Sequence, residues 1–534
     1  MGKQRRAPGR ARLTPAGAAK GSEQGKRDRL LKPGQNCWRI ERAGRLAVII
    51  DAADYFAAAK AAITRARHSV LLVGWEFDLR IKLEPERTSS EAPDELGQFL
   101  KWVAGERPDL RIYVLQWDGA MLATIARQIM PMLWLELVWH HRIHFRLDSD
   151  HPWGACHHQK IVVIDDALAF CGGIDMTADR WDTRAHRDGD PCRVRPDGSP
   201  YAPFHDVTVA VDGPAAQALG ELARERWYRA TGRRLQPPQV GRDIWPDGLK
   251  PLLRDVDVAI ARTHPLRPGR PPVREIEQLY QDAIAAGHRI IYCESQYLAS
   301  ASIADALAER LGEPDGPEVV IVNPQTAAGW LEERAMDSAR ALVLGRLRNA
   351  DRHRRLGVYY PVTEQGAPIY VHAKVLIIDD RLLRIGSSNL NNRSMGFDTE
   401  SDLAIEAPED TERGAVVRER IAELRNDLLA EHLGVERAKV AMALREHGSL
   451  IAAIESLRRR DGRTLLPLEV ESPGEVERLV PDFRLLDPEF PGQAERRLTH
   501  LAKRLTLAPR RALADAGRWL LDYASSRLPS GRRA

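Results

Sequence analysis

The sequence is poor in cysteine and contains no long apolar segment. Its 534 residues include five cysteines, which are widely spaced and form no CxxC pair, so neither a disulfide framework nor a zinc site is indicated. No apolar run reaches the ~18 residues that a membrane-spanning helix needs. The best candidate, residues 129–139, contains Pro131 and Glu136 and predicts a buried helix or strand, with a lipid-facing lip as the alternative. No signal peptide is visible, and these absences predict a cytoplasmic chain.

Positive charge is scarce in the body of the chain and concentrated at its ends. The net charge is +4, and residues 1–32 and 496–534 each contribute +8, so the residues between them carry −12. Basic segments of this kind suit anionic lipid headgroups or nucleic acid, and they are also typical of solubilising disordered ends. An acidic body argues against a groove that tracks nucleic acid. Solubilising ends are the favoured interpretation of the charge pattern, and peripheral contact with the inner membrane surface is the alternative.

A helix followed by a strand occurs twice, about 220 residues apart. Residues 53–67 have apolar side chains at helical spacing, and residues 69–77 form a short apolar run of strand length. Residues 273–286 and 289–298 repeat that order. Alternating helices and strands in both halves predict an α/β architecture with an internal duplication.

Composition also places the boundaries of the predicted units. Residues before Cys37 lack apolar periodicity, residues 236–252 are rich in proline and glycine, and residues 411–447 are strongly helical with a stop at Gly448. Residues 496–527 return to a helical pattern, which predicts a docked surface helix or an interfacial helix on anionic membrane. The predicted domains are a disordered basic tail (1–36), a first repeat (37–250), a second repeat (251–435) and a helical basic C-terminal extension (436–534).

The decisive pattern is H-x-K-x4-D, which also occurs twice. A single copy would be weak evidence, but two copies in an independently duplicated frame are specific. The residues are His158, Lys160 and Asp165 in the first half, and His372, Lys374 and Asp379 in the second.

The spacing within each motif has a structural meaning. Residues i and i+2 of a β-strand point to the same face, so each motif presents an imidazole beside an ammonium group, while the aspartate points elsewhere and is structural. A small turn begins seven residues after each aspartate. It contains Gly173 and Asp175 in the first copy, and Ser387 and Asn389 in the second. Such a turn can offer backbone N–H groups to an anion, and Asn389 adds a side-chain amide.

Two histidines and two lysines suit a phosphodiester better than a metal ion, because lysines repel a cation and donate to anionic phosphoryl oxygens. A neutral imidazole can attack phosphorus, and a protonated one can pass its proton to the leaving oxygen. Such a site needs surroundings that separate the two pKa values. Asp206 and Glu400 begin equivalent apolar runs after each motif. We interpret them as partners that orient the imidazoles, with ordinary strand-edge acids as the alternative.

These segments resemble the phospholipase D superfamily, and in particular its eukaryotic-type subgroup, over roughly residues 37–433. The resemblance rests on HQKIVVIDDALAFCGGID, PFHDV, ESQYL, and IGSSN followed by DTE. It implies two α/β repeats related by a pseudo-twofold axis, with mixed sheets flanked by helices and one active site at the repeat interface. It also implies a reaction without metal or cofactor, in which His158 attacks and His372 protonates the leaving group. The phosphoryl oxygens would be held by Lys160, Lys374 and Asn389.

The predicted function is hydrolysis or headgroup exchange on a glycerophospholipid at a membrane surface, through a phosphohistidine intermediate. A cardiolipin-synthase-like phosphatidyltransferase is a variant of this prediction. The main alternative is a nuclease of the same superfamily, since the paired motif also serves nucleic-acid phosphodiesters. A non-catalytic lipid-binding protein is disfavoured because both motifs are intact.

Overall fold

The computed structural model describes residues 29–87, 91–119, 140–239, 242–327, 330–469 and 487. The apolar run at 129–139, the second basic segment and most of the first lie outside the described residues. Within the described part of the chain, no helix is long and apolar enough to cross a membrane.

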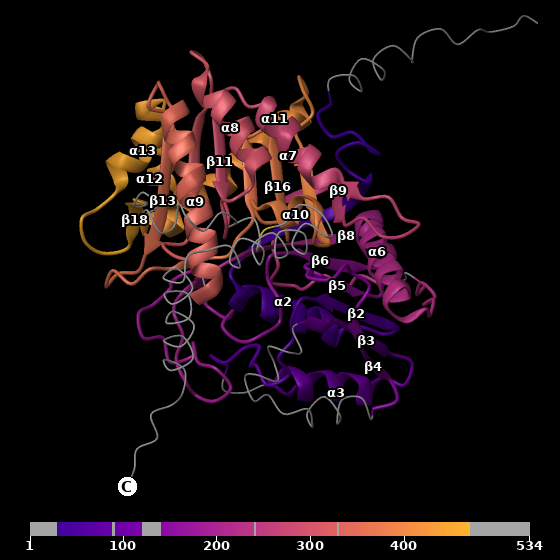
Figure 1. Cartoon of the computed structure of the whole chain (residues 1–534). Helices are drawn as coiled ribbons and strands as arrows, with labels where there is room; N and C mark the ends of the chain where they lie inside the picture. The colour runs from indigo at the N-terminus through magenta and orange to yellow at the C-terminus, as the bar shows by residue number, and fades with distance from the viewer. Residues whose placement is uncertain are drawn as a thin grey trace, which may run out of the picture.

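One mixed β-sheet runs through both halves of the chain (Figure 1). Its first-half strands are β1 (Arg39–Ile50), β2 (Ser69–Gly74), β3 (Arg111–Trp117), β4 (Ile143–Asp148), β5 (Ile161–Ile164), β6 (Leu168–Gly172) and β8 (Val207–Asp212). Its second-half strands are β9 (Leu253–His264), β10 (Val273–Arg274), β11 (Ile290–Glu294), β12 (Glu318–Val322), β13 (Leu356–Val362), β15 (Val375–Ile378), β16 (Leu382–Gly386), β17 (Glu400–Glu406) and β18 (Thr464–Pro467). Two short strands, β7 (Phe204–His205) and β14 (Tyr370–Val371), pair with each other outside this sheet.

The strand order is symmetric about the centre of the sheet. It runs β18-β13-β12-β11-β15-β16-β17-β9-β1-β8-β6-β5-β2-β3-β4, with β10 paired to β9. Outward from the antiparallel β1–β9 pair, each strand of the first half has a counterpart in the second, and β18 is added at one edge. The predicted fold class is therefore confirmed: two α/β repeats lie about a pseudo-twofold axis at the β1–β9 pair.

The strands that carry the motifs are buried on both faces. Every residue of β2 and β5 is buried, and so is every residue of their counterparts β11 and β15. Their sequences, such as IVVI in β5 and VLII in β15, are short runs rich in β-branched residues, as expected for strands covered on both sides. These strands form a rigid base for the residues that precede them.

Helices cover both faces of the sheet. On one face, α6 (Gly213–Thr231) and α11 (Glu412–Leu433) share one apolar core with strands of both halves. The other face carries two separate cores, one with α2 and α3 and one with α7, α8 and α9. The helices are α2 (Ala52–Thr64), α3 (Leu96–Glu106), α6 (Gly213–Thr231), α7 (Glu275–Ala285), α8 (Ala301–Gly312), α9 (Trp330–Ala350), α10 (Asn392–Gly396), α11 (Glu412–Leu433), α12 (Arg437–His447) and α13 (Leu450–Leu457).

The duplicated helix–strand units are present as α2–β2 and α7–β11, close to their predicted bounds. The helix predicted over residues 411–447 is two helices. Gly434, with φ 62°, ends α11, and Gly448, with φ 65°, ends α12. Glycine adopts this left-handed conformation without a Cβ penalty, which makes it a common helix terminator.

Both ends of the described chain pack against the second half. Residues 29–36, which the sequence predicts to be disordered, are held in place instead: the backbone N–H groups of Leu30 and Leu31 donate to the Glu406 carboxylate at 3.0 and 3.1 Å. In the C-terminal extension, β18 pairs with β13 and widens the sheet. The boundary between the predicted repeats, at residues 250 and 251, stays a prediction.

Candidate active site

The sequence predicts that the motif histidines and lysines lie inside strands. In the structure they lie in extended segments just before β5 and β15. Each segment is paired across the two halves. The backbone N–H of His158 donates to the carbonyl of Thr399 at 2.9 Å, and that of His372 donates to the carbonyl of His205 at 2.8 Å. These crossed backbone contacts place each histidine beside the acid that follows its pairing partner.

Each imidazole is bonded to a carboxylate of the opposite half. Nδ1 of His158 lies 3.0 Å from Oε2 of Glu400, and Nδ1 of His372 lies 2.6 Å from Oδ2 of Asp206. Both carboxylates are completely buried. A carboxylate accepts hydrogen bonds, so Nδ1 carries the proton and Nε2 is the nitrogen left for chemistry. The structure thus places Asp206 and Glu400 behind the histidines, in crossed order.

The two carboxylates have different support. Glu400 accepts hydrogen bonds from the hydroxyls of Ser387 at 2.5 Å and Ser394 at 2.7 Å. Asp206 accepts one from the backbone N–H of Val207 at 2.8 Å. Gly173 occupies the position equivalent to Ser387, and a Cβ built there would lie 2.1 Å from Oδ1 of Asp206. The predicted small residues of the two turns therefore border the two carboxylates directly.

Each lysine folds back over its own motif. Nζ of Lys160 donates to the carbonyl of His158 at 3.0 Å and forms an ion pair with Asp175 at 3.1 Å. Nζ of Lys374 donates to the carbonyl of His372 and lies 3.5 Å from Oε1 of Gln296. No carboxylate corresponds to Asp175 in the second turn, because Asn389 stands there instead.

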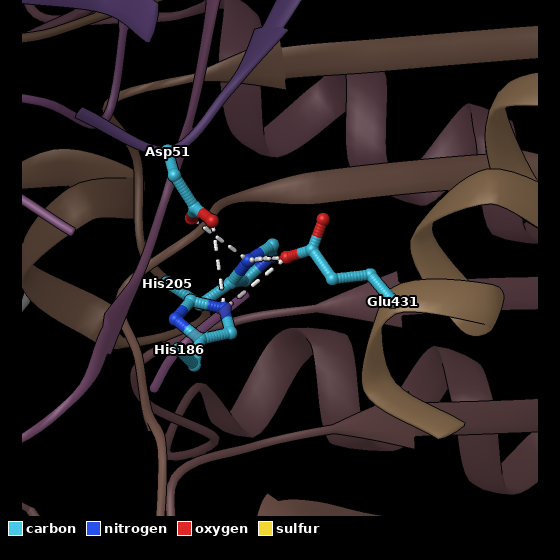
Figure 2. A group of neighbouring side chains, drawn as sticks. All are labelled: Asp51, His186, His205 and Glu431. Atoms are coloured by element: carbon cyan, nitrogen blue, oxygen red, sulfur yellow. Dashed lines mark hydrogen bonds and ion pairs between the residues drawn. The ribbon is translucent and has the colours of Figure 1, made fainter. Parts of the chain in front are cut away.

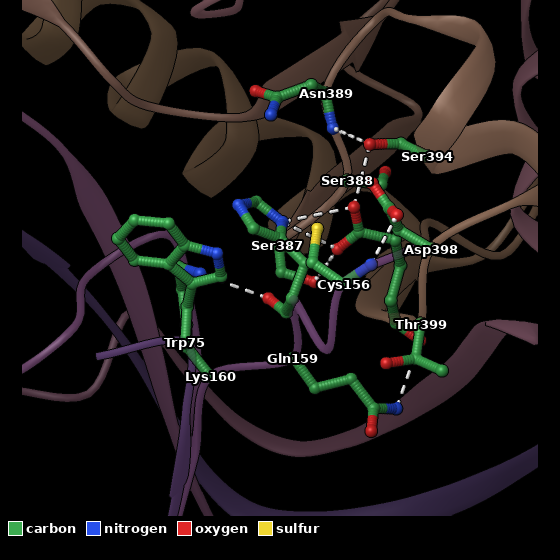
Figure 3. A network of polar contacts seen from close by, with 12 residues as sticks. Trp75, Cys156, Gln159, Lys160, Ser387, Ser388, Asn389, Ser394, Asp398 and Thr399 are labelled. Carbon is green, nitrogen blue, oxygen red and sulfur yellow. Dashed lines mark hydrogen bonds and ion pairs between the residues drawn. The ribbon is translucent and has the colours of Figure 1, made fainter. Parts of the chain in front are cut away.

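Asn389 has an unused acceptor at this site. Its backbone N–H donates to the hydroxyl of Ser394 at 3.0 Å (Figure 3). Its side-chain Oδ1 is buried and accepts no hydrogen bond from the described residues. Buried polar atoms are rarely left unpaired in native proteins, so this oxygen is suited to accept from a donor group of a ligand that enters the cavity.

Burial and neighbouring cations shape the proton affinities. Burial, with Lys160 and Lys374, holds the pKa of His158 well below its ordinary value. Burial and Lys374 do the same for the pKa of His372. Burial also lowers the pKa of Lys374 to about 7 and raises the pKa of both Asp206 and Glu400. The imidazoles are therefore neutral in the empty site, and an incoming anion would favour the protonated form of one of them.

Both histidines open onto one cavity of about 710 Å³. Its polar lining includes both histidines, Lys160, Arg180, Asn389 and Arg393. Its aromatic and apolar lining, called the aromatic wall below, consists of Trp75, Trp117, Tyr201, Phe204, Tyr297, Met336 and Tyr370. Trp75 and Trp117 are stacked with ring centroids 5.6 Å apart. The arrangement can hold an anionic group next to an apolar one.

The motif aspartates bond to backbone N–H groups at the far ends of the motif strands. Asp165 accepts hydrogen bonds from the N–H groups of Arg67, His68 and Ser69, at 2.7 to 2.8 Å. Asp379 accepts the equivalent bonds from His288, Arg289 and Ile290, at 2.6 to 2.8 Å. Each aspartate therefore ties the end of its motif strand to the start of the neighbouring strand, β2 or β11.

Several residues at the site escape sequence reasoning. Ser394 supports Glu400, and Asp398 accepts from the backbone N–H of Cys156 at 2.8 Å (Figure 3). Trp75 and Gln296 occupy equivalent places after β2 and β11 and both line the cavity. The duplicated frame could have identified this last pair, since both follow the apolar run of a duplicated strand.

A family model described as Phospholipase D (PLDc) matches residues 350–454, the segment with the second motif and Glu400. Phospholipase D alpha 1 of Vigna unguiculata is 25% identical over 520 residues, which cover 70% of this chain and 63% of that protein. Phospholipase D A of Dictyostelium discoideum is 25% identical over 425 residues, which cover 66% of this chain and 32% of that protein.

The chain spans less than two thirds of the length of these relatives. Among solved structures, the phosphatidylserine synthase of Haemophilus influenzae Rd KW20 aligns with 76% of this chain and 91% of its own. Its TM-score is 0.48 and its sequence identity 15%.

Proposed function

We propose that this chain, a member of the eukaryotic-type subgroup of the phospholipase D superfamily, is a phosphodiesterase that hydrolyses or exchanges the headgroup of glycerophospholipids. The observation that carries the proposal is the crossed pairing of two imidazoles with two buried carboxylates on one cavity. A lysine beside each imidazole supplies positive charge for a phosphodiester anion.

In the first step, Nε2 of His158 attacks phosphorus and the bond to the leaving oxygen breaks. The leaving oxygen takes a proton from Nε2 of His372, which becomes neutral. Lys160, Lys374 and the Asn389 amide donate to the non-bridging oxygens, whose charge is largest near the transition state. The product of this step is a phosphohistidine, with the lipid phosphoryl group on His158.

In the second step, water attacks phosphorus and the P–N bond breaks. His372, now neutral, takes the proton of the attacking water, and His158 leaves as the neutral imidazole. Water yields a phosphatidic acid, and an alcohol yields a new phosphatidyl ester by the same route. The balance between these two outcomes depends on which acceptor reaches the cavity.

The roles of the histidines follow from their carboxylates. Asp206 lies 2.6 Å from its imidazole and has one supporting backbone donor, whereas Glu400 shares its charge with two serine hydroxyls. A carboxylate with fewer competing donors stabilises an imidazolium more strongly. This difference supports His372 as the general acid and His158 as the nucleophile.

The aromatic wall supports a lipid substrate over nucleic acid. Trp75, Trp117 and Tyr370 offer a largely apolar surface within reach of the reacting histidines, which suits the glyceride side of a phospholipid. The basic segments at the two ends of the chain would add attraction to anionic headgroups. We propose a peripheral association with membrane on this basis.

A single incubation tests the function. The purified chain is mixed with phospholipid vesicles, and separately with single-stranded DNA, each with a primary alcohol present. The expected products are phosphatidic acid and the phosphatidyl alcohol from the vesicles, with DNA unchanged. Cleavage of DNA with no lipid product would favour the nuclease instead.

Trapping the intermediate tests the mechanism. Rapid acid quench and peptide mapping should find the phosphoryl adduct on the peptide that contains His158. An adduct on the His372 peptide would reverse the roles. Absence of any adduct, together with inversion at phosphorus, would contradict a covalent mechanism.

A further inference from the structure

A second cluster of titratable side chains lies behind the Asp206–His372 pair. It consists of Asp51, between β1 and α2; His186, in the loop after β6; His205, in β7; and Glu431, on α11. All four are buried, with at most 6% of their surface exposed. Figure 2 shows the four side chains directed toward a common centre. The reaction proposed above uses none of them.

One possible ligand atom from each of the four residues lies within 4.8 Å of the other three, and several contacts among their polar atoms are close to the spacing in a four-coordinate shell. Nε2 of His186 lies 3.3 Å from Oε1 of Glu431 and 3.4 Å from Oδ2 of Asp51. Nδ1 of His205 lies 2.9 Å from the same Glu431 oxygen and 3.1 Å from Oδ1 of Asp51. Ligand atoms of a tetrahedral Zn²⁺ site, at ~2.0–2.1 Å from the metal, are roughly 3.3 Å apart.

The outer nitrogen of each imidazole is held by a further carboxylate. Nδ1 of His186 lies 2.9 Å from Asp182, and Nε2 of His205 lies 2.9 Å from Glu294. Such a carboxylate fixes the outer nitrogen as the protonated one and directs a lone pair inward, as in carboxylate–histidine–metal triads. Oδ2 of Asp51 is buried and accepts no hydrogen bond within the described residues. This oxygen, which lies 3.4 Å from Nε2 of His186, therefore has no hydrogen-bond donor of its own in the described part of the chain.

The buried carboxylates of the cluster call for compensating positive charge, which a bound cation or protonated imidazoles can supply. Four buried carboxylates, those of Asp51, Asp182, Glu294 and Glu431, lie on or directly behind the centre. Two guanidinium groups bond to them, Arg184 to Glu431 at 2.5 Å and Arg193 to Asp182 at 3.1 Å. With neutral imidazoles the set retains two negative charges. Buried charge of that size requires compensation.

We propose that Asp51, His186, His205 and Glu431 bind one divalent transition-metal ion, and the donor set points to Zn²⁺. Two imidazole nitrogens and two carboxylate oxygens favour Zn²⁺ over Mg²⁺ or Ca²⁺, which prefer oxygen ligands. The four protein ligands close the shell and exclude water, which is typical of a structural site rather than a catalytic one.

The position of the site indicates a structural role for the ion. The backbone N–H of Asp206 donates to Oδ1 of Asp51 at 3.1 Å, and the carbonyl of His205 accepts from the N–H of His372. Glu431 comes from the second half, and the other three ligands come from the first. The ion joins the two halves and fixes the carboxylate behind His372, so it acts as a positioning element for the reaction.

The test measures metal directly on the full chain, purified without a polyhistidine tag. Elemental analysis should find about one Zn²⁺ per chain. Chain produced in medium with Co²⁺ should show the strong visible absorption of tetrahedral cobalt, because Zn²⁺ itself is spectroscopically silent. Asp51→Asn and Glu431→Gln should each reduce bound metal to background. Asp427→Asn, one turn earlier on α11 and also paired with Arg184, is the matched control and should keep the metal.

The native chain decides the proposal even where a variant fails to fold. A chain that contains no stoichiometric transition metal, and shows no tetrahedral absorption after production with Co²⁺, would overturn it. The cluster would then be balanced by two imidazolium ions. Full metal content in both Asp51→Asn and Glu431→Gln would overturn it as well.

Discussion

At the scale of single residues, the reactive groups are defined by their partners more than by their type. His158 and His372 each have Nδ1 bonded to a buried carboxylate, so each keeps one nitrogen for chemistry. The chain contains sixteen histidines, and His205, only a few ångströms behind His372, is bonded on both nitrogens. Its neighbours exclude it from attack on a substrate.

The proposed roles of His158 and His372 can be distinguished with substrates whose leaving groups differ in their need for a proton. His372→Ala should lower the rate on a phospholipid by ~10²–10⁴-fold, the usual contribution of a general acid, and should lower it far less on a nitrophenyl phosphodiester, whose leaving group needs no proton. His158→Ala should be inactive on both. The measurement is the initial rate of each purified variant on the two substrates. Equal losses for His372→Ala on both substrates would contradict its role as the acid.

Lys374 should produce a pH dependence near neutrality. Burial lowers its pKa to about 7, so the ammonium is present below that pH and is lost as the pH rises through it. If the charged form holds the phosphoryl oxygen, kcat/KM on a soluble phosphodiester should fall above about pH 7, by at most tenfold per pH unit. At saturating substrate the bound anion stabilises the ammonium, so kcat should hold to higher pH.

The control for that profile is Lys374→Arg. A guanidinium remains charged across this range, so the alkaline fall in kcat/KM should disappear, although the rate itself is lower. A fall that persists at the same pH in Lys374→Arg would assign it to another group.

At the scale of elements, the short segments before β5 and β15 matter more than the strands themselves. β7 pairs with β14 ahead of His372, and His157 bridges to Thr399 ahead of His158. These crossed pairings leave little room at the turn that contains Gly173. Because Gly173 has no side chain, the Asp206 carboxylate can approach its backbone closely. A residue with a Cβ at this position would block that approach.

Gly173→Ala should therefore damage both stability and activity. The new Cβ would lie 2.1 Å from Oδ1 of Asp206, so the carboxylate must move away from His372. We expect destabilisation of about 1–3 kcal/mol, the usual cost of overpacking, and a large loss of rate. Denaturant unfolding and initial rates measure the two effects.

Gly105→Ala is the matched comparison. Gly105 lies in α3, which contributes no residue to the candidate site, and a Cβ added there would meet no atom within 4 Å. Replacing a helical glycine by alanine should stabilise the protein by up to about 1 kcal/mol. A Gly173→Ala protein as stable and active as Gly105→Ala would show that Asp206 has more freedom than the packing implies.

At the scale of the whole molecule, the candidate site needs both halves, because neither half contains all of its residues. His158 lacks its carboxylate without the second half, and His372 lacks its carboxylate without the first. The β1–β9 pair, in register from Arg39–Ile260 to Leu46–Leu253, joins the halves through the centre of the sheet.

Separating the halves should test this dependence. Fragments 1–239 and 240–534, expressed alone, should be inactive, and co-expression should restore activity because β1 and β9 can still pair. Phosphodiesterase activity of the co-purified fragments is the measurement, and co-expression with His372→Ala in the second fragment is the control. Substantial activity of either fragment alone would show that a half can complete its own site.

The sequence alone was enough for the duplicated frame and for a hypothesis about the reacting groups. The apolar runs of the duplicated units contain the buried strands β2 and β11, and H-x-K-x4-D in two copies predicts His158, Lys160, His372 and Lys374 as the reacting groups without any coordinates. The break at Gly434 was missed although a glycine within a helical pattern is a local signal for a helix end. The fold of residues 29–36 was missed because its contact with Glu406 depends on tertiary packing.

Only the tertiary structure decided which acid serves which histidine. Glu400 follows the second motif but supports His158, and Asp206 follows the first motif but supports His372. The same holds for Asp51, His186, His205 and Glu431, which are spread over 380 positions of the chain and meet at one centre. Sequence spacing determines neighbours along a strand or helix. The crossed histidine–carboxylate pairs form because a pseudo-twofold axis brings each half against the other, and the cluster forms because tertiary packing brings distant segments together.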